Sequence, residues 1–133
     1  MTREPLSVSE DASMKEVVTL LQRHHIRHLP VTEARIVVGI VTDRDVRRAS
    51  PSLLSGIDKD NYEQVLNDTP VSRIMTREPF TVTPETDLME AVRLLTDKKI
   101  GSLPVVNGIE LVGIFTQSDA LGVLLELLEK ASP

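Results

Sequence analysis

Hydrophobic and polar positions follow the same order twice along this chain, at an interval of 74 residues. Alternation in residues 6–8, and again in residues 80–82, predicts a short strand. The apolar spacing then changes to that of one helix face, at Met14, Val17, Val18 and Leu21 and at Leu88, Ala91, Val92 and Leu95. Ser13 with Glu16, and Asp87 with Glu90, have capping-box spacing at the expected helix starts.

The rest of each copy predicts a hairpin and a second helix. Strands are expected over residues 28–32 and 36–42, and over 102–106 and 110–116. Asn107-Gly108 indicates a strong hairpin turn, and Glu33-Ala34 a weaker one. Helices are expected over 43–49 and from 117 to about 128. Each copy is thus predicted to be a β-α-β-β-α unit, giving an α/β (α+β) fold class.

The period reflects an internal repeat. At an offset of 74, 19 of the 47 positions from Met1 to Arg47 are identical, beginning with MTREP in both copies. We predict a first repeat over residues 1–61, a linker over 62–74 and a second repeat over 75–133. Because 133 residues supply core for one ordinary domain only, the two repeats should share a core as a pseudo-twofold pair.

The linker and the last helix carry further signals. Residues 50–61 favour a loop, and short helical turns are expected around 64–66 and 71–74. In the last helix Leu121, Leu124, Leu125 and Leu128 form an apolar stripe. Its simplest interpretation is core packing against the helix's own sheet, and the alternative is a dimer interface.

Composition excludes several classes of function. The chain has no Cys, one Tyr and two Phe, so it lacks a thiolate nucleophile, a disulfide framework and an aromatic platform for single strands. The net charge of −5 argues against a broad nucleic-acid surface. Neither a signal peptide nor an apolar run of membrane-spanning length is evident, which favours a cytoplasmic protein without membrane or nucleic-acid partners.

Candidate chemistry recurs where the last strand of each copy meets its second helix. The pattern G-h-h-T-x-x-D spans Gly39 to Asp45 and Gly113 to Asp119. Glycine permits close approach of a ligand or another backbone, and Thr at a helix start lies among free N–H groups that attract phosphate. The carboxylate accepts hydrogen bonds from a vicinal diol such as ribose. This combination suits a nucleotide lying across the helix start.

The same residues also fit a purely structural role. T-x-x-D resembles a capping box, which stabilises a helix without any ligand. Ser, Asp or Asn would cap equally well, yet both copies keep Thr, Asp and Gly while Asp43 and Arg44 have become Gln117 and Ser118. Duplication therefore shifts the balance towards function, although shared ancestry explains part of the identity.

These motifs resemble a tandem pair of CBS domains, a Bateman module. The resemblance covers nearly the whole chain, through the MTREP opening, the LPV segment and the G-h-h-T-x-x-D turn of both copies. It implies a regulatory sensor of adenosine-containing ligands, including AMP, ADP, ATP and S-adenosylmethionine, and not a catalyst. We expect no metal and no cofactor beyond that regulatory ligand. It is also compatible with a stand-alone protein of bacterial type or a fragment of a larger one.

The resemblance assigns roles to matching residues of both repeats. It implies that Asp45 and Asp119 hold ribose hydroxyls, that Thr42 and Thr116 contact phosphate, and that Ile40 and Ile114, beside Gly39 and Gly113, line the base pocket. Adenine is implied to lie near Ser7, Val8 and Pro30, or near Thr81, Val82 and Pro104.

Basic side chains distinguish the repeats. The residues Arg27, His28, Arg44, Arg47 and Arg48 align with Gly101, Ser102, Ser118, Leu121 and Gly122. The resemblance places Arg27 at a position that supplies phosphate contacts, with His28 and Arg44 as weaker candidates. We predict one stronger phosphate site and one weaker or differently selective site. The alternative is that the arginines form an exposed face that offsets nearby carboxylates.

Other readings remain open. His24 and His28 have i, i+4 spacing, but His24 and His25 align with Lys98 and Lys99, which favours helix-end cations over metal ligands. The leading hypothesis is a nucleotide-sensing module that acts as a homodimer of pairs or on an effector protein. The alternative is a dimerisation module without ligand. An enzyme is disfavoured because no nucleophile with a positioned base and no Walker loop is evident.

Overall fold

The computed structural model describes residues 2–3 and 5–132, and its contacts divide the chain into two bodies. The first body runs from Leu6 to Pro79. The second body joins the start of the chain, up to Pro5, to the residues from Phe80 onward. Spatial bodies and sequence repeats therefore differ at the opening segment of each repeat. The predicted boundaries 1–61, 62–74 and 75–133 stay predictions.

Each opening segment pairs with the last strand of the opposite repeat. Strand β1, Thr2–Arg3, runs antiparallel to β6, Glu110–Thr116. Strand β4, Thr76–Arg77, runs antiparallel to β3, Ile36–Thr42, with Arg77 opposite Gly39. The Thr-Arg pair near the start of each repeat thus forms a short strand on the hairpin of the other repeat.

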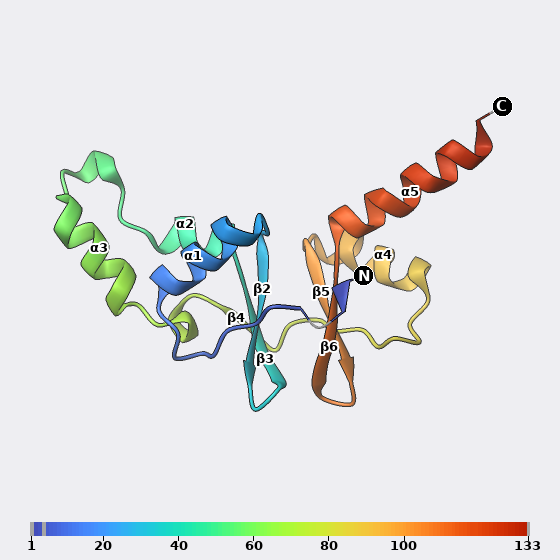
Figure 1. Cartoon of the computed structure of the whole chain (residues 1–133), viewed down its shortest axis with the longest axis horizontal. Helices are drawn as coiled ribbons and strands as arrows, with labels where there is room; N and C mark the ends of the chain where they lie inside the picture. Colours follow the sequence, from blue (N-terminus) through green and yellow to red (C-terminus); the bar gives the residue numbers. More distant parts are fainter. Residues whose placement is uncertain (1, 4, 133) are drawn as a thin grey trace. The chain divides into compact units, whose positions relative to one another are not determined.

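The first body packs helices on a β-hairpin (Figure 1). Strand β2, His28–Glu33, pairs with β3, and α1, Met14–His24, precedes them. Helix α2, Asp43–Ala49, follows β3, and a 3₁₀ turn at Leu53–Ser55 leads to α3, Lys59–Asp68. A second 3₁₀ turn, Val71–Arg73, completes the connector between the repeats, which we define as residues 50–74.

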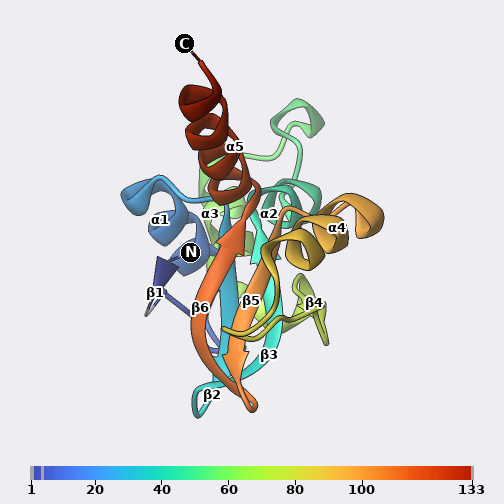
Figure 2. The same cartoon turned by 90° about the vertical axis from the view of Figure 1, so that its right-hand side faces the viewer.

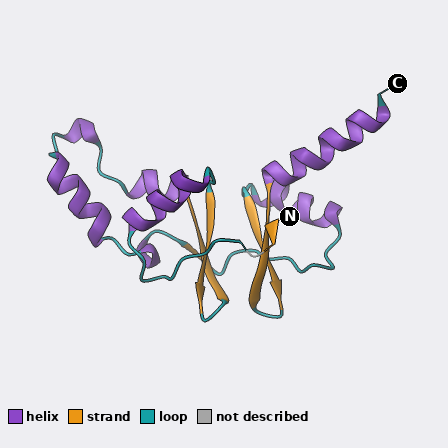
Figure 3. Ribbon diagram, in the orientation of Figure 1, coloured by secondary structure: helices purple, strands orange, loops and turns teal. Residues whose placement is uncertain are grey.

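The second body repeats the hairpin with a longer final helix (Figure 3). Helix α4, Leu88–Lys98, leads to β5, Ser102–Asn107, which pairs with β6. Helix α5, Gln117–Ala131, follows. Both hairpins carry an irregularity at the same place, between Val31 and Thr32 and between Val105 and Val106. The predicted β-α-β-β-α order is confirmed in both repeats, with Thr2–Arg3 and Thr76–Arg77 as the opening strands.

Three local predictions were wrong. Residues 6–8 and 80–82 are not strands, because only Val8 and Val82 bridge, in parallel, to Val31 and Val105. Asp87 makes no side-chain cap, whereas Ser13 accepts a hydrogen bond from the N–H of Glu16 at 3.1 Å. The connector holds a ten-residue helix where single turns and a loop were expected, because Asp58 caps it and Leu66 anchors it in the core.

The hairpin turns also differ from the sequence prediction. Strands β2 and β5 extend through Glu33 and Asn107, so the turns lie one residue later than expected. In the second body Gly108 has φ +68°. In the first body Ala34 and Arg35 have φ 49° and 69°, a left-handed conformation that non-glycine residues adopt at a cost.

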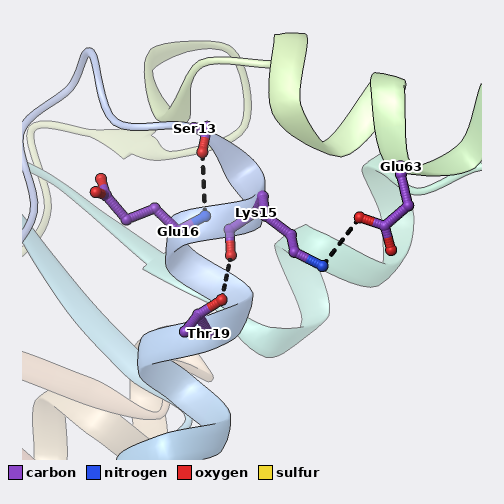
Figure 4. A network of polar contacts seen from close by, with 5 residues as sticks. All are labelled: Ser13, Lys15, Glu16, Thr19 and Glu63. Carbon is purple, nitrogen blue, oxygen red and sulfur yellow. Dashed lines mark hydrogen bonds and ion pairs between the residues drawn. The ribbon is translucent and has the colours of Figure 1, made fainter.

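Connector residues cover the helical face of the first body. The N–H of Met14 donates to the Thr69 carbonyl at 2.8 Å, and the N–H of Val71 to the Ala12 carbonyl at 2.8 Å. Lys15 donates to Glu63 on α3 at 3.0 Å (Figure 4). Met14 and Leu66 are consequently buried, with exposed fractions of 0% and 5%.

The matching face of the second body is open. Leu88 and Met89 on α4, aligned with Met14 and Lys15, are 44% and 66% exposed. The α5 stripe of Leu121, Leu124, Leu125 and Leu128 is 49% to 64% exposed. Core packing of this stripe against its own sheet is therefore wrong. The core of the second body is instead built around Leu95, Leu103, Val105 and Phe115.

Candidate functional site: the strand-to-helix turn of each repeat

The turn of the first repeat is a complete capping box. The N–H of Thr42 donates to Asp45 Oδ2 at 2.9 Å, and the N–H of Asp45 donates to Thr42 Oγ1 at 3.1 Å. The N–H of Asp43 donates to the Arg27 carbonyl at 3.0 Å, which ties the helix start to the strand that precedes it. The structural role expected for T-x-x-D is therefore fulfilled, and Asp45 Oδ1 lies outside these bonds.

The second repeat builds the same turn with one added bond. The N–H of Thr116 donates to Asp119 Oδ2 at 2.8 Å, and the N–H of Asp119 to Thr116 Oγ1 at 3.2 Å. The Thr116 hydroxyl also lies 3.1 Å from Asp119 Oδ2. The N–H of Gln117 donates to the Gly101 carbonyl at 3.0 Å, as Asp43 does to Arg27. Backbone geometry is thus conserved between the copies while the side chains around it differ.

Residues implied to surround adenine come together within each body. The N–H of Val8 donates to the Pro30 carbonyl at 3.1 Å, and the Val8 carbonyl accepts from Thr32 N–H at 2.8 Å. Pro30 lies opposite Ile40 in the hairpin, and the Thr32 hydroxyl is 3.2 Å from Ser7 Oγ. Val82 repeats the same pair of bonds with Pro104 and Val106.

These bonds limit what the backbone can offer a ligand. The N–H groups of Val8 and Val82 are already donated to proline carbonyls, and both side chains are buried. Ser7 and Thr81, by contrast, are exposed. An adenine at this place would therefore meet the neighbouring exposed residues before it met the valine amides.

Gly39 is explained by a close backbone approach. A Cβ at this position would lie 2.7 Å from Met75 Sδ and 2.9 Å from the Thr76 carbonyl oxygen. Both contacts come from the segment that forms β4. Of the two reasons considered for this glycine, approach of another backbone is the one that the structure demonstrates, and its ligand contact stays a prediction. Gly113 pairs with Arg3 as Gly39 pairs with Arg77.

The basic residues of the first repeat lie in three different environments. Arg47 forms an i, i+4 ion pair with Asp43 at 3.7 Å, as the exposed-face alternative expects. Arg27 and Arg44 are exposed and, within residues 2–3 and 5–132, form no ion pair. His28 lies opposite Thr42 in the hairpin and is half-buried. Arg27, His28 and Thr42 therefore surround one turn, while Arg47 is engaged elsewhere.

His28 has an unusual environment. Its Nδ1 atom is buried and has no hydrogen-bond partner among the described residues. Burial lowers the pKa of the His28 imidazole below its ordinary value, Asp43 and Asp45 oppose that shift, and Arg27 reinforces it. A buried nitrogen without a hydrogen-bond partner lowers the stability of the folded state, so the burial of the His28 ring is locally destabilising. Ser102, at the equivalent position of the second repeat, is also buried, but its side chain has no buried atom that lacks a hydrogen-bond partner among the described residues.

No metal centre or membrane segment emerges in the part of the chain that the structure describes. His24 lies in the last turn of α1 and His25 is its left-handed C-cap. Within residues 2–3 and 5–132 no three His, Cys, Asp or Glu side chains gather as a metal site would require. No described helix is both long and apolar enough to cross a bilayer.

The CBS domain family model matches residues 1–52 and 71–126, both repeats of the chain. The chain belongs to the CBS domain family. A CBS domain-containing protein of Dictyostelium discoideum is 30% identical over 135 residues, which cover 100% of this chain and 93% of that protein.

Solved structures of CBS proteins share this fold. A crystal structure of a putative acetoin utilization protein from Vibrio cholerae has TM-score 0.78 and 31% identity, and the match covers 100% of this chain and 94% of that one. CBSX2 from Arabidopsis thaliana has TM-score 0.82 and 26% identity over 97% of this chain and 93% of its own. CBSX2 has also been solved in complex with AMP, with TM-score 0.78, 28% identity and coverage of 96% and 93%.

Proposed function

We propose that this CBS pair is a regulatory module that senses an adenosine-containing nucleotide, with AMP as the first candidate. The observation that carries the proposal is the repeated Thr-Asp turn, whose backbone is the same in both bodies while Arg27 and His28 border only the first. The AMP complex of CBSX2 supports this choice of ligand class. ADP, ATP and S-adenosylmethionine are the other candidates to compare.

In the proposed complex the carboxylates of Asp45 and Asp119 accept hydrogen bonds from ribose hydroxyls through oxygen not used by the cap. Thr42 or Thr116 contacts phosphate. Arg27 adds a charge-assisted contact in the first repeat, which Gly101 cannot provide in the second. We therefore propose unequal affinities, with the phosphate-bearing ligand favouring the site that Arg27 serves.

The proposed module is not a catalyst. Its output is a change in how two copies associate, or in how the pair contacts an effector protein, in the cytoplasm. Ligand can shift such an equilibrium only by its difference in affinity for the two states. The module is therefore proposed to work as a homodimer whose association is linked to nucleotide occupancy.

Calorimetric titration with AMP tests the ribose assignment. Replacing Asp45 with Ala should weaken binding about ten-fold to a hundred-fold, since a hydrogen bond to a charged group contributes about 1.5–3 kcal/mol. The substitution also removes a helix cap, so Asp58→Ala is the matched control: Asp58 caps α3 by accepting from Asn61 N–H at 2.8 Å. Equal affinity in the parent, Asp45→Ala and Asp119→Ala proteins would contradict the assignment.

A second candidate is a dimerisation module without ligand. The complete capping boxes favour it, because they account for Thr42, Asp45, Thr116 and Asp119 without any nucleotide. A thermal-shift panel of AMP, ADP, ATP, S-adenosylmethionine and NAD separates the two. A ligand at one hundred times its dissociation constant adds about 2.7 kcal/mol of apparent stability. If none of these ligands changes the melting temperature, the dimerisation module is favoured.

A further inference from the structure

His28 carries a buried side-chain atom without a hydrogen-bond partner, its Nδ1 nitrogen, and no other residue in the part of the chain that the structure describes has one. It is the first residue of β2 and lies opposite Thr42, where β3 ends and α2 begins. Its other ring nitrogen, Nε2, is not among the buried unpartnered atoms. A polar atom left unpaired in this way calls for an explanation, and a bound ligand is one of those to test.

Three charged side chains act on the His28 ring. In decreasing order of effect they are Asp43, Arg27 and Asp45. The two carboxylates favour the protonated ring, although Asp45 already accepts a hydrogen bond from the N–H of Thr42 at 2.9 Å. Burial, the largest influence, lowers the pKa of His28, and Arg27 lowers it further. Before any ligand binds, the ring is therefore neutral at about pH 7.

The second repeat shows that the turn forms without this histidine. Ser102 takes its place and lies opposite Thr116, at the point where β6 runs into α5 (Figure 2). Gly101 stands where the first repeat has Arg27. Because the same capping box forms beside a neutral hydroxyl and a glycine, the cap alone does not account for the Arg27-His28 pair.

A phosphate at this turn would change the charge around the ring. Arg27 is exposed and, within residues 2–3 and 5–132, forms no ion pair, so its guanidinium is available to an anion. A phosphate dianion bound there offsets the positive charge of Arg27 and itself attracts a protonated imidazole. Burial of Nδ1 by the protein is present before and after binding, so the added negative charge is the main change. The pKa of His28 is consequently higher in the complex, and binding is accompanied by proton uptake.

We propose that His28 couples nucleotide binding at the first repeat to pH: its ring takes up one proton from the buffer when a phosphate-bearing ligand binds beside Arg27 and Thr42. The affinity of this site for AMP therefore rises as the pH falls, and AMP in turn favours the protonated ring. The second repeat, with Gly101 and Ser102, binds without this coupling. The inference rests on the nucleotide site of the proposed function and adds a regulation to it.

Calorimetric titration of the full chain with AMP, in two buffers of different ionisation enthalpy, measures the protons taken up on binding. The parent should take up more protons than His28→Ser, which introduces the residue of the second repeat. Between about pH 8 and pH 6 the AMP affinity of the parent should rise about three-fold to ten-fold relative to that of the variant. The comparison with the variant is essential, because a phosphate monoester itself titrates near about pH 6.

Two controls isolate the ring and the phosphate. His25→Lys keeps His28, and Lys99 of the second repeat has the same left-handed C-cap conformation as His25, so this variant should take up as many protons as the parent. Adenosine, which lacks the phosphate, should bind without a difference between the parent and His28→Ser. Circular dichroism should show that both variants keep the fold, since Ser102 and Lys99 occupy these positions in the second repeat.

An NMR titration of the parent observes the ring without any substitution. The chain has three histidines, and the His28 signals are those lost in His28→Ser. The titration midpoint of His28 should lie below 6.5 in the free chain and move upward when AMP is added. Equal proton uptake by the parent and His28→Ser, or a midpoint that AMP leaves unchanged, would overturn the coupling while the nucleotide site stands. Absence of any AMP binding would overturn both proposals.

Discussion

The two bodies carry the same hairpin and the same capped turn, yet their helical faces differ in what covers them. In the first body α3 and the second 3₁₀ turn close over α1, so that Leu66, Val71 and Met75 join the core. In the second body the corresponding face bears the exposed residues Leu88 and Met89. Aligned residues of the two repeats are therefore not buried to the same extent. The first body has the connector packed over its helical face, whereas, among the described residues, no corresponding segment packs over Leu88 and Met89 in the second body.

The largest expected effect tests this difference in cover. Leu66→Ala should destabilise the protein by about 2–4 kcal/mol, because it leaves a cavity where a buried leucine packed. Leu124→Ala, at 49% exposed, should cost less than about 1 kcal/mol. Urea unfolding measures both losses. An equal decrease in the free energy of unfolding for the two variants would show that Leu66 of α3 contributes no more to stability than the exposed Leu124.

A substitution at Gly39, where β3 and β4 come close together, tests the pairing of the second opening segment with the first repeat. Gly39→Ala should cost about 1–3 kcal/mol, because its Cβ forces Met75 and the Thr76 carbonyl of β4 to move. Gly122→Ala in α5 is the opposite control: nothing lies within 4 Å of its Cβ, and alanine favours the helix by about 0.5–1 kcal/mol. Thermal unfolding should give the highest melting temperature for Gly122→Ala, an intermediate one for the parent and the lowest for Gly39→Ala. Any gain in stability for Gly39→Ala would contradict the close approach of β4.

The hairpin turns offer a smaller contrast. Replacing Ala34 by Asn and Arg35 by Gly should stabilise the first body by about 1 kcal/mol, because both positions have positive φ and the new residues tolerate it. Ile109→Gly in the second hairpin should give no gain, since only Gly108 of that turn has positive φ. Denaturation midpoints compare the two. A gain at Ile109 equal to that at the first hairpin would refute the explanation.

The smallest expected effect is a pH dependence that belongs to the first repeat. The folded-state pKa of His28 is lowered, chiefly by burial, so the unfolded chain binds a proton more readily. Stability should therefore rise with pH from the folded pKa of His28 up to its ordinary value near 6.5, and be complete above it. His28→Ser, which installs the residue of the second repeat, should flatten the curve in that window. An unchanged slope measured by urea unfolding at several pH values would exclude His28 as its source.

Much of the fold followed from local pattern. Period-2 and helical spacing placed the hairpins and both long helices of each repeat, because those elements are built from contacts that recur every two or four residues. Strand β3, at Ile36–Thr42, and strand β6, at Glu110–Thr116, match their predicted ranges. The predicted opening strands were wrong because the pairing of Thr2–Arg3 and Thr76–Arg77 depends on partners far along the chain.

The candidate site was predictable only in part. The turn chemistry of Thr42 and Asp45 could be proposed from spacing, and the structure shows that the cap uses one oxygen of that carboxylate. Their contact with a nucleotide stays a prediction, as do those of all the residues named for the site. The orphaned Nδ1 of His28 had no sequence signal, because its burial comes from packing around the strand start.

By itself, the sequence determined that this protein is a tandem repeat of one β-α-β-β-α unit with a capped Thr-Asp turn in each copy. Those features depend on local spacing and on residue identities that can be compared directly. Only the tertiary structure decided that the opening segment of each repeat pairs with the last strand of the other repeat, and that the α5 leucines remain exposed. Both outcomes are set by competition between distant segments for the same strand edge or helix face, and no local pattern records which segment wins.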